Sequence, residues 1–577
     1  MSARYPNTSE PRQASIAVTP SSIQRYSWFL LFIAGLGGLL YGIDVGIIAA
    51  ALLYLSKTID LTLGQTSIIV AAVLGGSMVS SLVAGLLADL FGRKKMMIVS
   101  GLMFVASVGL IVLSQGFVPL FLGRLLQGMS GGVIAVVVPL YLAECLSANH
   151  RGRGTAIFQF MLTFGIVCAA LIGWSFTHQA EAAIAAAAGN PALILAAQNH
   201  AWRGMFLSVV YPGLLFFLGA FALSETPRWL LLRGRTDEAL TALRRSTPEQ
   251  EAQTELAEMQ TLAAENRQAK AAGTAGSLLR RKYVVPFVLA CVIMICNQTT
   301  GINSILGFLV VILRQAGMTA GHATQGDVAV KVLNCVMTLV AVALVDRKGR
   351  TFLLRIGTAG VVIALVAGGT LFLGVESGRS DVRARIEAAQ TGNAVTLPIN
   401  AATLGTASAE DRPRSLTVLY SYGHGDRVAT VLSDAPDPVL TLVPEAQEAQ
   451  ATLRIKRALY GPVPSEKTGW LITACLALFM ASFSVGPGVV VWLAMSELMP
   501  TRIRSMGMGI SLLLNQGAST LIAAVFLPVV GNYGYSAMFF FWAACTVVYF
   551  LTAAFFLPET KGKTLEEIEM HFEQRGR

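Results

Sequence analysis

Three ionisable side chains lie inside long apolar stretches of this sequence, where an unpaired charge is costly. They are Asp44, Arg124 and Lys331. If these stretches cross a membrane, each charge costs a few kcal/mol even on insertion-derived scales, so each side chain needs a partner or a function. A carboxylate that alternates between an Arg partner and a proton is a candidate proton carrier. The first chemistry that the sequence suggests is therefore proton transfer coupled to another process.

Asp44 and Arg124 are expected to form a pair. Asp44 lies 16 residues after Trp28, or roughly 24 Å along a helix. Arg124 lies early in a stretch that runs in the opposite direction, so its depth should be similar. Two interpretations stay open, a proton-coupling pair and a static structural ion pair.

Lys331 also has two interpretations. It lies 15 residues before Asp346, or roughly 22 Å from that end of its helix. In the first interpretation it forms an i,i+4 pair with Asp327. In the second its ammonium group faces a substrate cavity and favours an anionic substrate.

Composition places these charges in a membrane protein. The chain has 577 residues, of which 54% are hydrophobic and 13% charged, and its mean hydropathy is +0.62. This leaves too little polar surface for soluble domains of that length. The net charge of +10 comes from Arg and Lys in short connections between apolar stretches, which marks membrane topology rather than nucleic-acid binding.

Twelve apolar stretches are long enough to cross about 30 Å of hydrocarbon as helices. They cover approximately residues 26–55, 66–90, 96–114, 117–145, 155–177, 203–223, 283–313, 327–345, 352–373, 468–498, 506–530 and 536–557. We predict an all-α membrane protein whose first span targets it to the membrane. The seven Cys residues fall in or beside these spans without ligand-like spacing, so neither disulfides nor a metal site is expected.

The chain is duplicated. The pattern Asp89-Leu-Phe-Gly-Arg93 follows the second span, and Asp346-Arg-Lys-Gly-Arg350 follows the eighth. In each copy a later apolar stretch closes on a Glu. The spacing from Asp89 to Glu144 is 55 residues and that from Asp346 to Glu497 is 151, so the second copy holds about 96 extra residues. Parallel repeats with a substrate path between them are typical of secondary transporters.

Basic residues cluster at the exits of the even-numbered spans, which predicts that this side and both termini are cytoplasmic. The acids and arginines at these exits are candidates for a cytoplasmic gate, or are topology signals only: Asp89, Arg93, Glu144, Arg151, Asp346, Arg350, Glu497 and Arg504. The expected organisation is an N-terminal tail (1–25), a six-helix half (26–223), a cytoplasmic helical linker (224–282), helices seven to nine (283–375), an external insertion (376–467), helices ten to twelve (468–557) and a cytoplasmic tail (558–577).

The insertion is expected to form a small α+β unit outside the membrane, with a largely unstructured loop as the alternative. Residues 415–421, 427–432 and 439–443 are β-prone, and Gly423, Gly425 and Asp426 give a hairpin signal. Pro436 and Pro438 act as breakers.

The motifs together resemble the sugar porter family of the major facilitator superfamily. The resemblance covers nearly all of the chain except the N-terminal tail and the insertion. It rests on residues 85–95, Arg124 with Gly128 and Gly132, 139–144, 151–153, 202–205, 224–230, 297–303, 346–350, 486–492, 496–497 and 558–562. Each motif alone is weak, whereas their order is specific.

This resemblance implies the major facilitator fold, alternating access and uptake of a monosaccharide or polyol. Asp44 matches the position that is Asp in proton symporters and Asn in facilitators, which favours symport. The residues on the family's sugar-contacting positions, including those that depart from its pattern, are Gln159, Asn297, Gln298, Asn303, Asn334, Trp492, Asn515 and Gln516. Asn297 and Gln516 are departures, as are Gly307-Phe308 and Ile166, so the identity of the sugar stays open.

The expected function is proton-coupled uptake of a hexose, pentose or polyol by a monomer in the plasma (inner) membrane, without a cofactor. The alternatives are transport of a sugar acid or other hydroxylated acid, and a sugar receptor that does not transport. An enzyme is not expected, because no nucleophile–base or metal constellation lies outside the membrane motifs. The family match runs on both sides of the insertion, so we expect the insertion to be dispensable for transport.

Overall fold

The structure is a computed structural model that describes residues 20–146, 148–271, 281–404, 413–423, 425–434, 438–444, 451–499 and 504–559. In these residues, 12 helical segments are long and apolar enough to cross a membrane. This confirms the predicted twelve-helix architecture.

The first six spans form one bundle, the N-half. Its helices are α1 (Pro20–Thr58), α2 (Leu63–Phe91), α3 (Arg93–Val112), α4 (Phe117–Cys145), α5 (Ala148–Ala186) and the pair α6 (Pro191–Ser208) and α7 (Val210–Ala222). These helices pack closely because glycines on one helix lie against the backbone of the next. A Cβ on Gly42 of α1, for example, would collide with the carbonyl oxygen of Leu162 on α5.

The other six spans form the C-half, in which two spans are broken. Span seven consists of α11 (Arg281–Thr299) and α12 (Ile302–Gln315), and span ten of α17 (Glu466–Phe483), the π-turn η2 (Ser484–Gly488) and α18 (Val490–Leu498). The unbroken helices are α13 (Ala320–Lys348), α14 (Arg350–Ser377), α19 (Arg504–Tyr533) and α20 (Tyr535–Phe555). The sequence reading predicted both spans but not their breaks.

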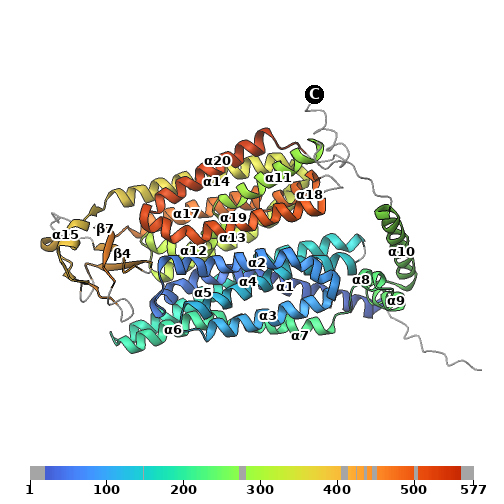
Figure 1. Ribbon diagram of the computed structural model, residues 1–577, viewed down its shortest axis with the longest axis horizontal. Helices are drawn as coiled ribbons and strands as arrows, with labels where there is room; N and C mark the ends of the chain where they lie inside the picture. The colour runs from blue at the N-terminus through green and yellow to red at the C-terminus, as the bar shows by residue number, and fades with distance from the viewer. Residues whose placement is uncertain are drawn as a thin grey trace, which may run out of the picture.

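The two halves lie side by side along the long axis of the molecule (Figure 1). Across the interface between them, α2 packs against α19, α5 against α13 and α1 against α12. Individual bonds also cross it, such as that from the Leu527 backbone N–H to Ser67 Oγ (3.0 Å). A large apolar core includes residues from both halves, among them Ile47 and Phe308.

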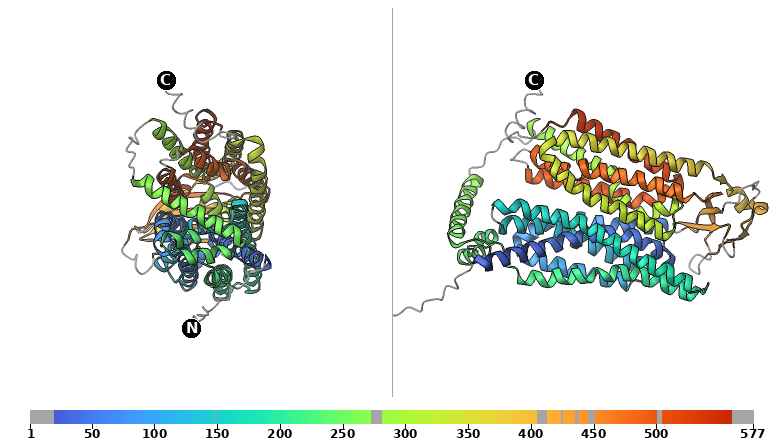
Figure 2. Two further views of the ribbon diagram at one scale, coloured as in Figure 1. Left: turned by 90° about the vertical axis from the view of Figure 1, so that its right-hand side faces the viewer. Right: turned by 180° about the vertical axis from the view of Figure 1, so that it is seen from behind.

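The helical linker lies at one end of the bundle, which we call the linker end (Figure 2). It contains α8 (Pro227–Leu232), α9 (Thr236–Arg244) and α10 (Glu249–Ala271). These helices share a small apolar cluster that includes Leu230, Leu243 and Leu256.

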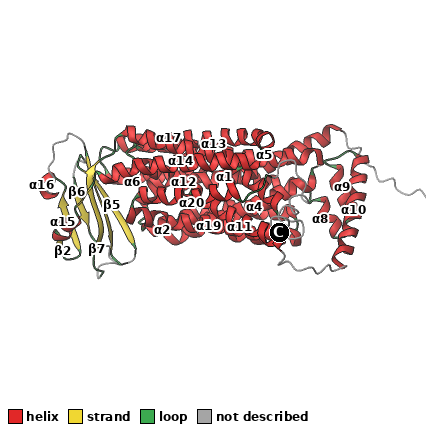
Figure 3. Ribbon diagram, turned by 90° about the horizontal axis from the view of Figure 1, so that it is seen from above, coloured by secondary structure: helices red, strands yellow, loops and turns green. Residues whose placement is uncertain are grey.

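The insertion lies at the opposite end, the sheet end, and contains two antiparallel sheets (Figure 3). Its elements are β1 (Ser380–Asp381), α15 (Arg383–Ala388), β2 (Gln390–Thr391), β3 (Ala394–Pro398), α16 (Ala401–Leu404), β4 (Arg414–Ser421), β5 (Asp426–Leu432), β6 (Val439–Leu442) and β7 (Arg454–Pro462). The strand orders are β1-β7-β4-β5 and β2-β3-β6. This confirms the predicted α+β insertion and its β4–β5 hairpin, whereas β1, β2, β3 and β7 were not predicted.

The four-stranded sheet packs on the apolar core of the insertion through one of its faces. Alternate residues of a strand point to opposite faces, and Leu416 and Val418 of β4 are buried together with Ala458 and Tyr460 of β7. The other face of this sheet turns toward the helix ends.

Candidate functional site

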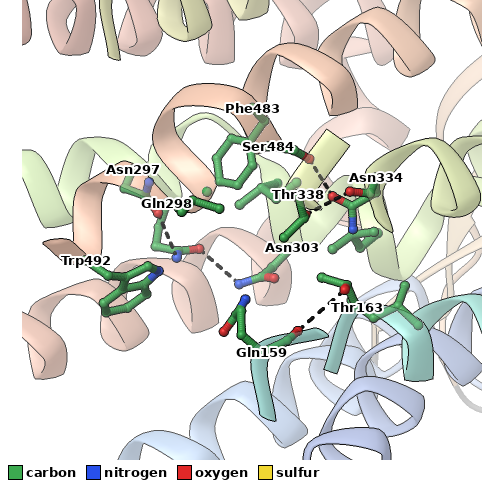
Figure 4. A pocket seen from close by; sticks show the side chains of 15 residues that line it. Gln159, Thr163, Asn297, Gln298, Asn303, Asn334, Thr338, Phe483, Ser484 and Trp492 are labelled. Atoms are coloured by element: carbon green, nitrogen blue, oxygen red, sulfur yellow. Dashed lines mark hydrogen bonds between the residues drawn. The ribbon is translucent and has the colours of Figure 1, made fainter. Parts of the chain in front are cut away.

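An uncharged cavity of about 150 Å³ lies between the halves near the middle of the helices. Its wall comes from α5 of the N-half and from α11, α12, α13 and span ten of the C-half (Figure 4). Among the described residues that line it, the polar side chains are amides, hydroxyls and one indole: Gln159, Thr163, Asn297, Gln298, Asn303, Asn334, Thr338, Ser484 and Trp492.

The break in span seven brings three amides to this cavity. Gly301 has φ +84°, and a Cβ there would collide with the Trp542 ring. Only glycine fits both the left-handed backbone and the ring contact. The helix therefore stops at Thr299 and restarts at Ile302, with Asn297 and Gln298 before the break and Asn303 after it. Interrupted helices of this kind form substrate sites in transporters.

These amides form one hydrogen-bonded cluster. Asn303 Nδ2 donates to Gln298 Oε1 (2.9 Å) and to Ser519 Oγ (2.7 Å). Gln298 Nε2 lies 3.2 Å from Asn515 Oδ1 and 3.3 Å from Asn297 Oδ1. Asn515 in turn donates to the Met294 carbonyl oxygen (2.9 Å). The cluster fixes the side-chain rotamers and leaves donors and acceptors available for a ligand.

The break in span ten completes the C-half wall. Pro487 lacks a backbone N–H and interrupts the helix as a π-turn, and its own carbonyl oxygen accepts from Asn297 Nδ2 (3.0 Å). Ser484 Oγ, in the same turn, lies 2.6 Å from Asn334 Oδ1 of α13. Trp492 follows on α18 with 43% of its surface exposed, so its ring is available for stacking at the cavity edge.

The N-half contributes fewer polar groups to the cavity. Gln159, Thr163 and Ile166 lie on one side of α5. Thr163 Oγ1 donates to the Phe160 carbonyl oxygen (2.9 Å) and lies 3.6 Å from Cys335 Sγ of α13. This last contact joins the two halves beside the cavity.

Six of the eight substrate-site residues expected from the sequence line the cavity: Gln159, Asn297, Gln298, Asn303, Asn334 and Trp492. Asn515 lies behind Gln298 and holds it. Gln516 is not among the described lining residues, and its side chain interacts instead with Tyr41 of the N-half. The sequence reading missed Thr163, Thr338 and Ser484, although Thr338 follows Asn334 at the i,i+4 spacing of one helix face.

Asp44 and Arg124 form a buried pair, as their depths suggested. Arg124 Nη1 lies 3.2 Å from Asp44 Oδ1 and 2.7 Å from Gln127 Oε1, and Asp44 and Arg124 are 0% and 1% exposed. The guanidinium group also lies 5.6 Å from the centre of the Phe206 ring. Asp44 Oδ2 has no hydrogen-bond partner, so one carboxylate oxygen is free to take a proton.

Lys331 makes two contacts that do not involve the cavity. Its Nζ lies 2.8 Å from Asp327 Oδ2, which is the i,i+4 pair considered from the sequence. It also donates to the Gly46 carbonyl oxygen of α1 (3.1 Å). Because α1 belongs to the N-half and α13 to the C-half, Lys331 joins the halves.

The first signature forms an ion network at the linker end. Arg93 Nη2 lies 2.7 Å from Asp89 Oδ1 and donates to Glu144 Oε1 (3.0 Å). Its side chain and that of Glu144 are about 95% buried. Glu225 accepts from the backbone N–H groups of Arg93 (2.9 Å) and Lys94 (3.1 Å), which places an anion at the start of α3.

The second signature repeats this arrangement. Arg350 donates to Glu497 Oε1 (2.9 Å), and Glu559 accepts from the backbone N–H groups of Arg350 (3.0 Å) and Thr351 (3.1 Å) at the start of α14. The sequence analysis included the motifs 224–230 and 558–562 but gave Glu225 and Glu559 no role in these networks. Their signal was the Glu-Thr dipeptide after spans six and twelve.

The ion pairs of Arg93 with Asp89 and Glu144 lie within the N-half, and the pair of Arg350 with Glu497 lies within the C-half. Among the remaining gate candidates, the side chains of Arg151, Asp346 and Arg504 lie outside the described residues. A gate role for this set therefore stays a prediction.

Comparison with known proteins identifies the family. The profile described as "Sugar (and other) transporter" matches residues 30–390 and 455–572, so the chain belongs to that family. The gap between the two matched ranges falls within the insertion. The fold is that of the major facilitator superfamily: the chain is similar to the xylose transporter XylE from E. coli in an inward-open conformation, with a TM-score of 0.65, 21% identity and coverage of 94% of this chain and 99% of that chain.

Two curated relatives cover nearly the whole chain. The glucose transporter GlcP of Staphylococcus epidermidis is 26% identical over 95% of this chain and 98% of its own length. The galactose-proton symporter of Escherichia coli is 25% identical over 96% of this chain and 95% of its own. The chain is thus a multi-pass membrane protein of a sugar transporter family with proton-coupled members.

Proposed function

We propose that this chain is a proton-coupled symporter of a monosaccharide (hexose or pentose) or polyol that works by alternating access. The observation that carries the proposal is the uncharged amide cluster at two broken helices between the halves. Amides suit hydroxyl groups because each amide offers a donor and an acceptor. A cavity between two packed halves can open to one side and then to the other.

Neutral substrates fit the cavity better than acids. The described lining residues carry no charge. Lys331, which was the reason for considering an anionic substrate, contacts Asp327 and Gly46 and does not line this cavity. Trp492 and Phe483 offer aromatic faces for the C–H face of a sugar ring. Transport of a sugar acid and sugar binding without transport are the alternatives that the experiment below separates.

Proton coupling is proposed from Asp44 and Arg124. A proton on Asp44 would weaken its attraction to Arg124, and the cation would favour release of that proton again. One relative is a galactose-proton symporter, which supports coupling in this chain. The alternative of a static ion pair predicts transport that does not respond to a proton gradient.

The orientation is proposed from charge. Basic residues at the linker end include Arg93, Lys94, Arg347 and Arg350, and positive connections normally face the cytoplasm. We therefore place the linker end and both termini in the cytoplasm and the sheet end outside, with the chain as a monomer in the plasma (inner) membrane. The gate residues Asp89, Arg93, Glu144, Arg350 and Glu497 would then act on the cytoplasmic side.

Uptake into proteoliposomes tests the proposal. The purified chain is assayed with labelled glucose, xylose, myo-inositol and glucuronate, with and without an inward proton gradient. We expect at least one neutral compound to accumulate above its external concentration only when the gradient is present. Accumulation of glucuronate alone would favour the acid transporter, and binding without uptake of any compound would favour the receptor.

A further inference from the structure

A second, larger cavity of about 800 Å³ lies at the sheet end, between the insertion and the ends of the helices. We call it the vestibule. Its roof is the face of the four-stranded sheet that turns away from the insertion core. Strand register places Thr417 opposite Thr430 and Leu459, and Leu419 opposite Val428 and Arg457, and all six residues line the cavity. Its size falls in the range of about 300–1,000 Å³ that small-molecule sites occupy.

Four cations line the vestibule and come from three parts of the chain. Lys57 lies at the end of α1 in the N-half, Arg314 at the end of α12 in the C-half, and Arg379 and Arg457 belong to the insertion. Lys57 and Arg314 are electrostatic neighbours from opposite halves, and the Glu181 carboxylate acts on Lys57 with the opposite sign. Burial lowers the pKa of Arg379, and the neighbouring Arg457 lowers it further, while Glu376 opposes both effects.

The two carboxylates of the vestibule are already engaged. Glu376 accepts from the backbone N–H groups of Tyr535 (2.7 Å) and Ser536 (3.3 Å) at the start of α20. Glu181 accepts from the Tyr54 hydroxyl (2.8 Å). Within the described part of the chain, Lys57, Arg314, Arg379 and Arg457 form no ion pair. The buried Nε of Arg379 lacks any hydrogen-bond partner.

We propose that the vestibule is a binding site for a small polyhydroxylated anion, such as a sugar acid or a sugar phosphate. The vestibule has four cationic side chains and two carboxylates that are already hydrogen-bonded, so its net charge should attract anions. Guanidinium groups also match the geometry of carboxylate and phosphate oxygens. Hydroxyl partners are present in Thr417 and Thr430, which lie 3.4 Å apart through their Oγ1 atoms. The uncharged central cavity does not offer this chemistry, so the two sites take different ligands.

An anion in the vestibule would also act on transport. Without it, Lys57 and Arg314 repel each other across the two halves, and Glu181, which already accepts from the Tyr54 hydroxyl, offsets only part of this repulsion. The remaining repulsion favours separation of the halves at the sheet end. With it, both cations bind the same anion, and the halves are held together there. The anion is therefore expected to slow exchange of neutral sugar by favouring the state that is closed at the sheet end.

Isothermal titration of the purified full chain tests the site with glucuronate, glucose 6-phosphate, inorganic phosphate and glucose. The double variant Arg379→Gln/Arg457→Gln is expected to bind the preferred anion at least 10-fold more weakly and to bind glucose normally. Arg385→Gln, an exposed arginine of the same insertion, is the matched control and should not change binding. The relative affinities for the three anions show whether a carboxylate or a phosphate is preferred.

Two results would overturn the proposal. The first is the absence of anion binding to the wild-type chain, or equal binding to the double variant. The second is anion binding that excess glucose displaces and that Gln298→Ala abolishes, which would place the anion in the central cavity. Lys57→Gln, on a different element, provides an independent variant with an expected loss of at least threefold. Exchange of the neutral sugar that wild type transports confirms that these variants fold, and this exchange should become insensitive to added anion in the double variant.

Discussion

At the residue scale, the central cavity is organised by amides that hold one another. Gln298 contacts Asn297, Asn303 and Asn515, so its side chain is positioned before a ligand arrives. Preorganised polar groups of this kind lose little conformational entropy on binding. Each amide is therefore expected to contribute to affinity in two ways, through its own hydrogen bonds to the ligand and by fixing the rotamers of the neighbouring amides.

Gln298→Ala should weaken sugar binding without stopping the chain from folding. Loss of one or two hydrogen bonds, at about 0.5–1.5 kcal/mol each, corresponds to an increase in Kd of roughly 2-fold to 150-fold. Isothermal titration with the transported sugar measures it. Asn199→Ala removes a half-buried amide that donates to the Leu195 carbonyl oxygen of its own helix, outside the cavity lining, and should leave Kd unchanged. An unchanged Kd in Gln298→Ala would remove this cluster from the binding site.

Lys331→Met should impair the protein in the same way for every substrate. The change leaves Asp327 buried without its cation, at a cost of about 3–5 kcal/mol for a broken buried pair, and removes the bond to the Gly46 carbonyl oxygen. We expect a lower melting temperature and reduced transport of the neutral sugar. The double variant Asp327→Asn/Lys331→Met should recover most of the thermal stability. Unchanged transport of the neutral sugar together with a loss of glucuronate uptake would show instead that Lys331 faces the substrate.

Sequence reasoning at this scale succeeded where the partners are set by distance along helices. The Asp44–Arg124 pair follows from depth, and the Asp327–Lys331 pair from i,i+4 spacing. Sequence reasoning did not predict the hydrogen bond from Lys331 to the Gly46 carbonyl oxygen, because that bond depends on how the two halves pack. It did not separate Gln516 from Asn515 either, since α19 is apolar on most of its surface and its periodicity does not fix its rotation.

At the element scale, the duplicated helix starts are the most regular feature. Gly92 (φ +101°) and Gly349 (φ +91°) end α2 and α13 in backbone that favours glycine. Each is followed by a helix whose first N–H groups meet a carboxylate, Glu225 or Glu559. The two halves thus repeat a helix end, an arginine network and an anionic cap as one unit.

Glu225→Gln should destabilise the N-half by about 0.3–2 kcal/mol, the range for a charge at a helix N-terminus. The amide can still accept one hydrogen bond but no longer carries the charge that interacts with the start of α3. Thermal unfolding in detergent, followed by circular dichroism, measures the effect. Glu251→Gln, an exposed acid at the start of α10, is the control with the same chemical change. Equal melting temperatures in both variants would contradict the capping role.

Removal of the insertion should leave transport of neutral sugar intact. The structure defines the excision better than the sequence, because β7 continues to Pro462 and pairs with β1. Replacing residues 380–463 with a short Gly/Ser linker also removes the ion pair between Arg427 and Asp60 (2.6 Å). We expect neutral sugar uptake within a factor of about 3 of wild type, measured per molecule in the membrane. Abolished uptake at normal membrane levels would show that the insertion is needed for the transport cycle.

Most elements were predictable because a membrane span has a strong length and composition signal. The breaks at Gly301 and Pro487 were not predicted, since each lies inside an apolar stretch that passes as one span. The motifs at these breaks are Thr-Thr-Gly and Gly-Pro-Gly. Whether such a motif breaks a helix depends on the side chains packed beside it, such as Trp542 next to Gly301, and these are known only from the structure. Strand β7 was missed because buried and exposed residues do not alternate regularly along it. Ile455 and Ala458 are both buried although they are three residues apart, since a register shift lies between them.

At the scale of the whole molecule, two homologous bundles meet around the central cavity, and the buried pair of Asp44 and Arg124 lies inside the first bundle. The central cavity draws most of its polar groups from the C-half, whereas Asp44 and Arg124 lie in the N-half. Coupling therefore requires that protonation in one half changes how it packs on the other. Tyr41, three residues before Asp44, interacts with Gln516 of the C-half and is a direct connection of this kind.

The most direct test of proton-coupled sugar transport compares Asp44→Asn with wild type in proteoliposomes under an imposed inward proton gradient. The substrate is the sugar taken up fastest by wild type, and both uphill accumulation and gradient-free exchange are measured. Because the amide preserves the shape of Asp44 but carries no proton, we predict that exchange persists while accumulation above the external concentration is lost. Accumulation by Asp44→Asn to the wild-type level would contradict proton coupling through Asp44.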